Sequence, residues 1–254
     1  MLISHRYQFI FVKTRKTAGT SIEASLSRYC GDTDVITPIS LPDEPWRGQF
    51  GVCPQHYLPG HQADATGGHV PEWRRQAVRW MSKVELRRAH WVPYRMRRQL
   101  RNWQPRREIE GMGYYNHMTA AEIVEQVGAD IWQRYFKFCF ERNPLDKTIS
   151  HYYYSAPSES FDAYLERGDF CSDFDSYTLN GDLAVDFIGR FEHLSEDLNI
   201  VAQQLGIPFD GWLPRSKSGS RGKTIMASGL NPHQKAIICQ GFARELAFLD
   251  YALR

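Results

Sequence analysis

The hydrophobic pattern begins with a short continuous run of aromatic and β-branched residues, Tyr7–Val12, which predicts a buried strand. A polar loop follows this run. Ile22, Leu26 and Tyr29 then recur at helical spacing, and Gly31 follows them as a stop signal. The chain is therefore expected to open with a strand, a polar loop and a helix.

The rest of the chain repeats this alternation of strands and helices. A capping-box pattern at Thr119–Glu122 predicts the start of a helix, and Gly128 predicts its end. The aromatic-rich run Tyr135–Phe140 predicts a second buried strand, and a further strand is expected at Val185–Phe191. Helices are also expected from the turn at residues 143–144 to Tyr154, over Phe161–Glu166, over Ser195–Leu205 and over Asn231–Tyr251. This alternation predicts a single α/β domain with a parallel sheet.

Two stretches depart from the regular pattern. Residues 32–72 are rich in Pro, Gly and Asp, and they predict irregular structure with one short strand at Gln49–Val52. Residues 73–107 begin with an amphipathic helix and hold twelve Lys or Arg against one acid, Glu85, a balance of +11. The remaining residues carry −9, so an anionic partner is expected near the basic segment.

Three interpretations of the basic segment 73–107 remain open. Four of the seven tryptophans lie in it, and aromatic faces with arginines suit a groove for an acidic or glycan-bearing acceptor. The alternatives are a helix on a membrane surface and an ordinary amphipathic helix with a solvated cationic face. No nucleic-acid-binding module is recognisable, so no nucleic acid is expected as a partner.

Composition and cysteine usage indicate a cytoplasmic protein. The chain contains 42% hydrophobic and 24% charged residues, no apolar run of the ~20 residues that a membrane span needs, and no signal-peptide pattern. Its five cysteines lack CxxC spacing, which argues against a disulfide framework and a zinc site. Peripheral contact with the inner membrane surface is expected only if residues 73–107 form a membrane helix.

The loop after the first strand, Lys13–Ser21, has the chemistry of an anion-binding turn. A helix N-terminus offers unpaired N–H groups and partial positive charge. Gly19 lets the backbone approach a ligand closely, Lys16 adds a cation, and two hydroxyl residues follow. Because the lysine precedes the glycine, the order differs from the G-x-x-x-x-G-K-[ST] pattern of P-loops. The alternative is a strand–helix turn with a solvated lysine.

A second candidate anion site follows the strand Tyr135–Phe140. Arg142 stands at the strand end, and Ser150 lies eight residues further on the next predicted helix. Both side chains can meet one phosphate at the carboxyl edge of a parallel sheet, where such folds bind ligands. The alternative is that Arg142 pairs with an acid such as Asp146 and that Ser150 only packs.

Together, these elements resemble the nucleotide-binding motifs of sulfotransferases. Residues 16–21 (KTAGTS) resemble the loop that binds the 5′-phosphosulfate, and residues 138–153 (FCFERNPLDKTISHYY) resemble the motif that binds the 3′-phosphate. Residues 187–198 resemble a late strand–helix segment of the family. The chain is similar to the bacterial and Golgi carbohydrate-sulfotransferase branch, which includes heparan sulfate 2-O-sulfotransferase. The matches cover residues 1–30 and 113–254.

The resemblance implies a fold, a donor and an acceptor. The fold is a three-layer α/β/α domain of the P-loop nucleotide-binding type over residues 1–254, with residues 32–112 as a variable, basic, acceptor-facing insertion. The donor is 3′-phosphoadenosine-5′-phosphosulfate, which leaves adenosine 3′,5′-bisphosphate as the product. The acceptor is a hydroxyl, in this branch on a carbohydrate or glycolipid. No metal is required, because lysine and backbone dipoles can neutralise the leaving phosphate.

The resemblance also implies site residues. Lys16 would contact the bridging oxygen and the sulfonate. The 5′-phosphate would be surrounded by Arg15, Lys16, Thr17, Ala18, Gly19, Thr20 and Ser21. The 3′-phosphate would be held by Arg142 and Ser150. A late basic loop would close over the nucleotide with Arg215, Lys217, Arg221 and Lys223, unless it is an ordinary surface loop. Glu141 departs from the family pattern, and a carboxylate there should weaken a phosphate site unless it points away.

Transfer to a hydroxyl also needs a base, and His117 is the first candidate. It stands just before the capping box, and its position resembles a histidine motif of the 2-O-sulfotransferase group. A neutral imidazole suits proton abstraction at cellular pH. A capping or packing histidine is the alternative, with His69 as the alternate base and His61 a distant third. Glu23, on the loop helix, is expected to face solvent.

Two rival functions remain open. One is a nucleotide-dependent small-molecule kinase, against which the missing G-K-[ST] order and the lack of an evident Mg²⁺ carboxylate both argue. The other is a non-catalytic polyanion-binding protein built around residues 73–107.

Overall fold

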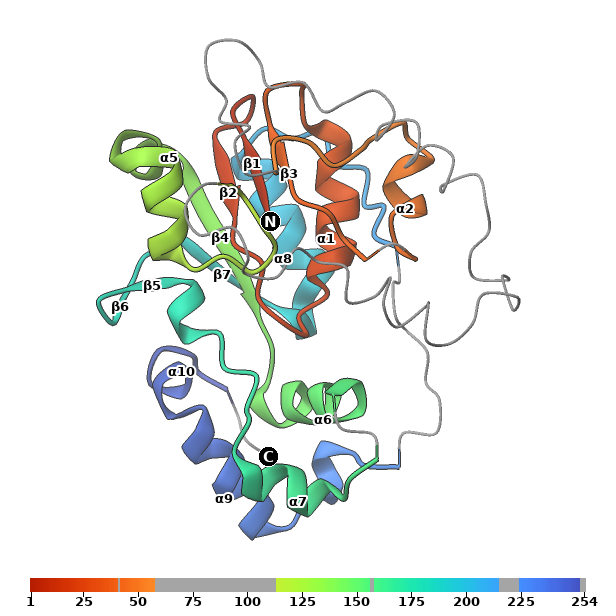
Figure 1. The fold of residues 1–254 in the computed structure, drawn as a ribbon, viewed down its shortest axis with the longest axis vertical. Helices are drawn as coiled ribbons and strands as arrows, with labels where there is room; N and C mark the ends of the chain where they lie inside the picture. Colours follow the sequence, from red (N-terminus) through yellow and green to blue (C-terminus); the bar gives the residue numbers. More distant parts are fainter. Residues whose placement is uncertain (41, 58–112, 156–157, 215–223, 252–254) are drawn as a thin grey trace.

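The centre of the fold is a five-stranded mixed sheet (Figure 1). The computed structural model describes residues 1–40, 42–57, 113–155, 158–214 and 224–251. The strands are β1 (Leu2–Ser4), β2 (Phe9–Phe11), β3 (Val35–Ile36), β4 (Phe136–Glu141) and β7 (Phe187–Arg190). Their order is β3-β1-β2-β4-β7. The prediction of an α/β fold is confirmed.

The predicted parallel sheet is confirmed at its centre and wrong at one edge. Strands β2, β4 and β7 are parallel, whereas β1 runs antiparallel to both β2 and β3. β1 and β2 form a hairpin in which Leu2 pairs with Phe11, and Gln8 adopts a positive φ of 51° just before β2. Three residues are too short to show a strand pattern, so the sequence did not reveal β1.

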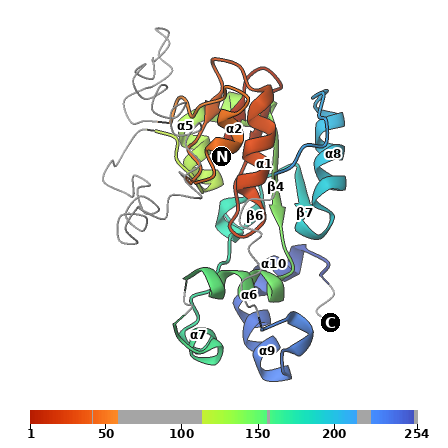
Figure 2. The same ribbon diagram turned by 90° about the vertical axis from the view of Figure 1, so that its right-hand side faces the viewer.

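Helices cover both faces of the sheet and extend beyond the carboxyl ends of its parallel strands (Figures 1 and 2). Their bounds are α1 (Gly19–Leu26), α2 (Pro45–Gly48), α5 (Ala120–Arg134), α6 (Pro144–Ser155), α7 (Phe161–Arg167), α8 (Leu194–Gln204), α9 (Pro232–Gly241) and α10 (Ala243–Phe248). Short 3₁₀ turns cover Ser27–Tyr29, Phe174–Ser176, Phe191–His193 and Ala227–Gly229, and β5 (Thr178–Leu179) pairs with β6 (Asp182–Leu183).

Strand alternation divides the core into two layers. Ile10 of β2 points to one face and packs in the same cluster as Ile123 of α5. Phe9 and Phe11 point to the other face, where α1 and α8 contribute residues such as Ile22. A third cluster joins α6, α7 and α9 below the sheet. The helices on both faces make three layers, and the helical group lies at the strand ends from which the candidate loops emerge.

Several predicted elements have different bounds in the structure. The capping box at Thr119 is present, but the helix only kinks at Gly128 (φ 80°) and continues to Arg134. Gln49–Val52 is a turn after α2 instead of a strand, and the strand of this region is β3. The last predicted helix is two helices that meet at Phe242, which is buried in the third cluster. The helix predicted within 73–107 lies outside the described residues.

Two further observations concern the expected compartment. Among the described residues, no helix combines the length and the apolar character that crossing a bilayer requires. All five cysteines fall within the described ranges, and no disulfide joins any two of them.

Gly189 of β7 provides a test of the β4–β7 pairing. It pairs with Phe140, and a Cβ atom at this position would lie 2.4 Å from Cε1 of the phenylalanine ring. Gly189→Ala should therefore lower the free energy of unfolding by about 1–3 kcal/mol in urea denaturation, because overpacking forces the ring or the strand to move. Gly31→Ala is the matched control, since open space surrounds Gly31, and it should stay within about 0.5 kcal/mol. Equal stability of the two variants would contradict this packing.

Candidate active site

The polar loop after β2 is fixed to the end of β4. The N–H of Val12 donates to the carbonyl of Phe138 at 2.9 Å, which extends the parallel pairing beyond the strand. The Thr14 hydroxyl donates to the carbonyl of Phe140 and lies 2.9 Å from the hydroxyl of Thr17. The loop therefore begins at the carboxyl edge of the sheet, as the sequence predicted.

The backbone of the loop has two positive-φ residues with one ordinary residue between them. Lys16 and Ala18 have φ angles of 64° and 62°, while Thr17 is not among the positive-φ residues. Alternation of left- and right-handed residues is typical of backbone concavities that bind anions. Ala18 is also the N-cap of α1, and its side chain cannot accept a hydrogen bond from the helix. Alanine is a poor N-cap, so the start of this helix suits an external acceptor.

Arg142 and Ser150 line one pocket, as predicted. The pocket has a volume of about 370 Å³ and is lined by Arg142, Asp146, Ile149, Ser150, Ile225, Met226, Ala227 and Ser228. Nη1 of Arg142 lies 3.5 Å from the carbonyl oxygen of Lys16, and its guanidinium stacks 4.1 Å from the Phe191 ring centre. The two candidate anion sites are therefore neighbours.

The environment of Arg142 leaves donor capacity for a ligand. Its Nε is buried and has no hydrogen-bond partner within the described part of the chain. Burial lowers the pKa of the guanidinium from its usual value, although the nearby Asp146 and Glu192 raise it. A buried cation gains most from an anionic partner, because water no longer solvates it.

Two predicted loop residues have specific partners on other elements. The Lys16 ammonium lies 4.3 Å from the ring centre of Tyr154 on α6, in a cation–π contact. Arg15 donates from its backbone N–H and from Nε to Asp173, each at 2.8 Å, and from Nη2 to the carbonyl of Ser172. Arg15 is thus held by an interior carboxylate, while the other loop residues, 17–21, lie at or near the start of α1.

Glu141, the departure from the family pattern, points into the protein. Its carboxylate pairs with the Lys147 ammonium at 2.7 Å, and Lys147 also pairs with Asp173 at 2.8 Å. Burial and the neighbouring Asp173 raise the pKa of Glu141, and the two carboxylates raise the pKa of Lys147 against the effect of burial. The carboxylate is therefore neutralised by Lys147 and does not face the pocket that Arg142 lines.

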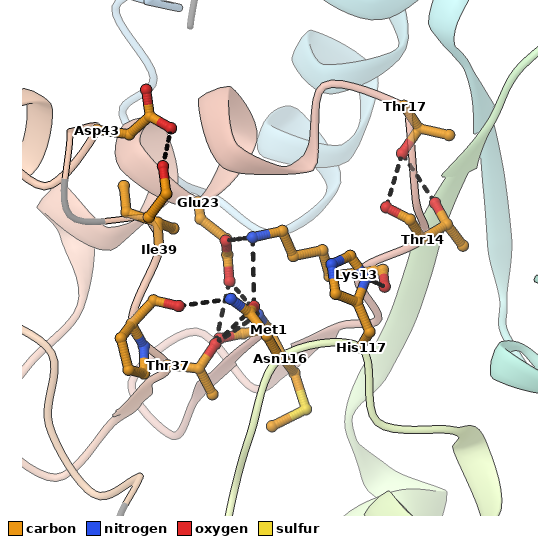
Figure 3. Close-up of polar contacts among 12 residues, drawn as sticks. Met1, Lys13, Thr14, Thr17, Glu23, Thr37, Ile39, Asp43, Asn116 and His117 are labelled. Carbon is orange, nitrogen blue, oxygen red and sulfur yellow. Dashed lines mark hydrogen bonds and ion pairs between the residues drawn. The ribbon is translucent and has the colours of Figure 1, made fainter. Parts of the chain in front are cut away.

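His117 lies against the start of the loop (Figure 3). Its Nδ1 is 2.9 Å from the carbonyl oxygen of Lys13. A carbonyl only accepts, so Nδ1 carries the proton in the neutral ring and Nε2 carries the lone pair. Burial, and next the charge of Lys13, lower the pKa of His117 to about 4. The ring is therefore neutral at cellular pH, and its backbone has a left-handed φ of 62°.

Glu23 is buried, so the prediction that it faces solvent is wrong. Its carboxylate is 0% exposed and pairs with the ammonium of Lys13 and the amino group of Met1. Asn116 accepts from Lys13 at 3.2 Å and from Met1 at 3.1 Å, and Thr37 joins the same cluster (Figure 3). This cluster connects α1 to the segment that carries His117.

The Lys13 side chain also explains the glycine at position 19. A Cβ atom at Gly19 would lie 2.8 Å from Cγ of Lys13. The lysine stem runs across the start of α1 to reach Glu23, and only a residue without a side chain leaves room for it. Gly19 therefore serves the internal ion pair, besides the ligand approach that the sequence indicated.

Four residues that contribute to the site were not predicted from the sequence. Asp173 lies in a segment without a recognisable motif, whereas Lys147 lies within the second motif, residues 138–153, at a position to which no role was assigned. Asn116 directly precedes the predicted base. Tyr153 accepts hydrogen bonds from the N–H groups of Thr224 (3.0 Å) and Ile225 (3.1 Å), and so anchors one wall of the pocket. Of these, Lys147 and Tyr153 had a sequence signal, because both belong to the second motif.

The remaining predicted residues lie outside the described part of the chain. They are His61, His69, Arg215, Lys217, Arg221 and Lys223. Within the described residues, no group of three or more His, Cys, Asp or Glu side chains is arranged to hold a metal ion.

Comparison with known proteins finds a relative that is itself uncharacterized. A protein of Archaeoglobus fulgidus, described as uncharacterized, is 36% identical over 101 residues, and the match covers 36% of this chain and 84% of that protein. The chain belongs to the same family as this archaeal protein. No protein-family model and no solved structure matches the chain.

The buried pair of Glu23 and Lys13 predicts a pH-dependent contribution to stability. Burial would raise the pKa of Glu23, but the Lys13 ammonium and neighbouring cations outweigh burial and lower it to about 2. A carboxylate with a lowered pKa stabilises the folded state above its unfolded value near 4.5, and this contribution is lost as the pH falls toward 2. Glu23→Gln should therefore cost about 3–5 kcal/mol at pH 7, and the difference from wild type should shrink below pH 4.5.

Chemical denaturation at several pH values measures this effect. Glu196→Gln is the control, since Glu196 is 78% exposed and its ion pair is with His193 on the surface, so its removal should change little. A Glu23→Gln difference that stays constant from pH 7 to pH 3 would show that the charge of Glu23 does not contribute.

Proposed function

We propose that this chain is a sulfotransferase that uses 3′-phosphoadenosine-5′-phosphosulfate as the donor. One observation carries the proposal: the loop of residues 13–21 and the pocket of Arg142 and Ser150 meet at the same edge of the sheet, with Arg142 Nη1 3.5 Å from the Lys16 carbonyl. The donor bears anionic groups at the 5′ and 3′ positions of one ribose. Two neighbouring anion sites suit such a molecule better than they suit a single phosphate.

The pocket has a polar and an apolar part, which suits a nucleotide. Arg142 and Ser150 supply donors for the 3′-phosphate. Ile149, Ile225 and Met226 supply apolar surface for the base. The start of α1 and the loop would hold the 5′-phosphate through backbone N–H groups.

The proposed chemistry is an in-line displacement at sulfur. The acceptor oxygen forms a bond to sulfur while the bond from sulfur to the bridging oxygen breaks, and adenosine 3′,5′-bisphosphate leaves. Lys16 would move from the Tyr154 ring to the bridging oxygen and stabilise its developing charge. Nε2 of His117 would take the acceptor proton, since its lone pair is free in the tautomer that Lys13 fixes.

The acceptor is proposed to be a hydroxyl on a carbohydrate or glycolipid. This part rests on the sequence resemblance, because the basic segment 73–107 lies outside the described residues. Binding of an acidic glycan and contact with the inner membrane surface remain predictions for that segment, as does a cytoplasmic location.

The kinase alternative has less support. A kinase needs carboxylates that hold Mg²⁺ beside the phosphates. Three acids near the loop already have cationic partners in the structure. Asp173 and Glu141 pair with Lys147, and Asp173 also pairs with Arg15. Glu23 pairs with Lys13. These ion pairs make the three carboxylates poor metal ligands. A non-catalytic polyanion-binding protein would not need the neutral, oriented His117.

Donor binding tests the proposed function directly. Adenosine 3′,5′-bisphosphate at about 100 times its Kd should raise the Tm by roughly 5–10 °C without Mg²⁺, because ligand binding to the folded state stabilises it by about 2.7 kcal/mol. Arg142→Gln should lose most of this shift. Arg134→Gln is the matched control, since its exposed pair with Asp130 lies away from the pocket.

Lys16→Ala should lower sulfate transfer from labelled donor by about 10²–10³. Stabilisation by ATP only with Mg²⁺ would support the kinase instead.

The role of His117 predicts an unusual pH profile. With a pKa lowered to about 4, the imidazole stays unprotonated far below its usual range. kcat/KM should therefore be constant from pH 8 to pH 6 and fall only near pH 4–5, where the ring gains a proton. His117→Ala should lower turnover by about 10²–10⁴ while donor binding persists. A fall in kcat/KM already near pH 6.5, or turnover of His117→Ala within tenfold of wild type, would show that His117 is not the base. His69→Ala would then be tested for the loss of turnover expected of the base.

A further inference from the structure

Asp173 is a buried carboxylate that holds the backbone of the candidate donor loop. It lies between α7 and β5, and its side chain is 2% exposed. One oxygen accepts the N–H of Arg15 and the other accepts Arg15 Nε, each at 2.8 Å. Arg15 directly precedes Lys16, so this carboxylate fixes the loop at the residue next to the proposed catalytic lysine.

The same carboxylate is connected to the second anion site. Lys147 pairs with Asp173 at 2.8 Å and with Oε2 of Glu141 at 2.7 Å. That oxygen of Glu141 accepts the N–H of Arg142 at 3.2 Å. One continuous path of charged groups therefore runs from the backbone of Arg15 to the backbone of Arg142.

Burial makes this path rigid. The Lys147 side chain is 0% exposed, and those of Asp173 and Glu141 are each 2% exposed. The two carboxylates balance the charges of the cations Lys147 and Arg15. Separating either acid from its cationic partner would leave a charge without a partner in a low-dielectric interior. The spacing between the two anion sites is therefore set by the protein interior instead of by the ligand.

We propose that Asp173 and Glu141 are positioning residues with separate roles around Lys147. Asp173 orients the loop that receives the 5′ end of the donor, and Glu141 orients Arg142, which receives the 3′-phosphate. This inference rests on the proposed function, and it assigns a role to an acid that no motif of the sequence indicated.

The test exploits the symmetry of the path. Asp173→Asn and Glu141→Gln each remove one of the two carboxylate partners of Lys147, and a purely structural role should make each variant weaken both ends of the nucleotide by the same factor. If the two carboxylates are positioning residues, Asp173→Asn should weaken binding of the 5′-phosphate, and Glu141→Gln should weaken binding of the 3′-phosphate. The probes are adenosine 5′-monophosphate and adenosine 3′-monophosphate, each titrated as a competitor of adenosine 3′,5′-bisphosphate on the full chain.

We expect the two variants to weaken the binding of opposite ligands. Asp173→Asn should raise the Kd of the 5′-monophosphate about tenfold, and that of the 3′-monophosphate less than about threefold, because a charge-assisted hydrogen bond to the loop is lost. Glu141→Gln should show the reverse, with the Kd of the 3′-monophosphate raised more than that of the 5′-monophosphate. Asp175→Asn is the control, since Asp175 is exposed and pairs with the exposed Arg244, and it should change neither value. If Asp173→Asn does not fold, Asp173→Glu retains the charge and should give a smaller loss, about threefold, for the same ligand.

Two other outcomes would overturn the inference, and they differ from each other. If wild type binds the bisphosphate but each variant weakens both monophosphates by the same factor, the carboxylates are structural only, and the proposed function stands. If wild type does not bind the bisphosphate, the proposed function is wrong, and the roles assigned to Asp173 and Glu141 are wrong with it.

Discussion

The parallel pairing of β2 with β4 is the constraint on which the candidate site depends. Thr14 and Phe140 are 126 positions apart in the sequence, yet the hydroxyl of one bonds the carbonyl of the other. Both strands end at this point, so the loop and Arg142 emerge side by side. A register slip of one residue would turn every side chain of β2 to the opposite face and would separate the two anion sites. The apolar alternation of the strands thus fixes the polar geometry beyond them.

Elements with strong local signals could be predicted from the sequence, and elements that depend on distant partners could not. The helix after Thr119 has its own capping box, and the strand Phe136–Glu141 holds three phenylalanines and a cysteine among its six residues. β1 has only three residues and exists because β2 and β3 pair with it. The break at Phe242 has a similar cause, because packing of this ring into the third cluster ends one helix and starts another.

The same distinction applies to the candidate site. The meeting of the loop with Arg142 and Ser150 followed from a general rule, that parallel strands bring their carboxyl ends to one edge. The partners of the charged residues did not follow from any rule of spacing. Glu23 was expected to face water because a lone acid on a helix usually does, but Lys13 reaches it from the preceding strand end. The interior carboxylate of Asp173 is separated from Arg15 by more than half the chain.

The contact between Lys13 and Gly19 has a consequence for the evolution of the family. A lysine at position 13 leaves no space for a side chain at position 19, because its stem crosses the start of α1. In a relative with a short residue at position 13, that steric demand disappears, and a glycine retained at position 19 would then reflect the ligand alone. Covariation between these two positions across homologues therefore separates the part of the loop motif that serves folding from the part that serves binding.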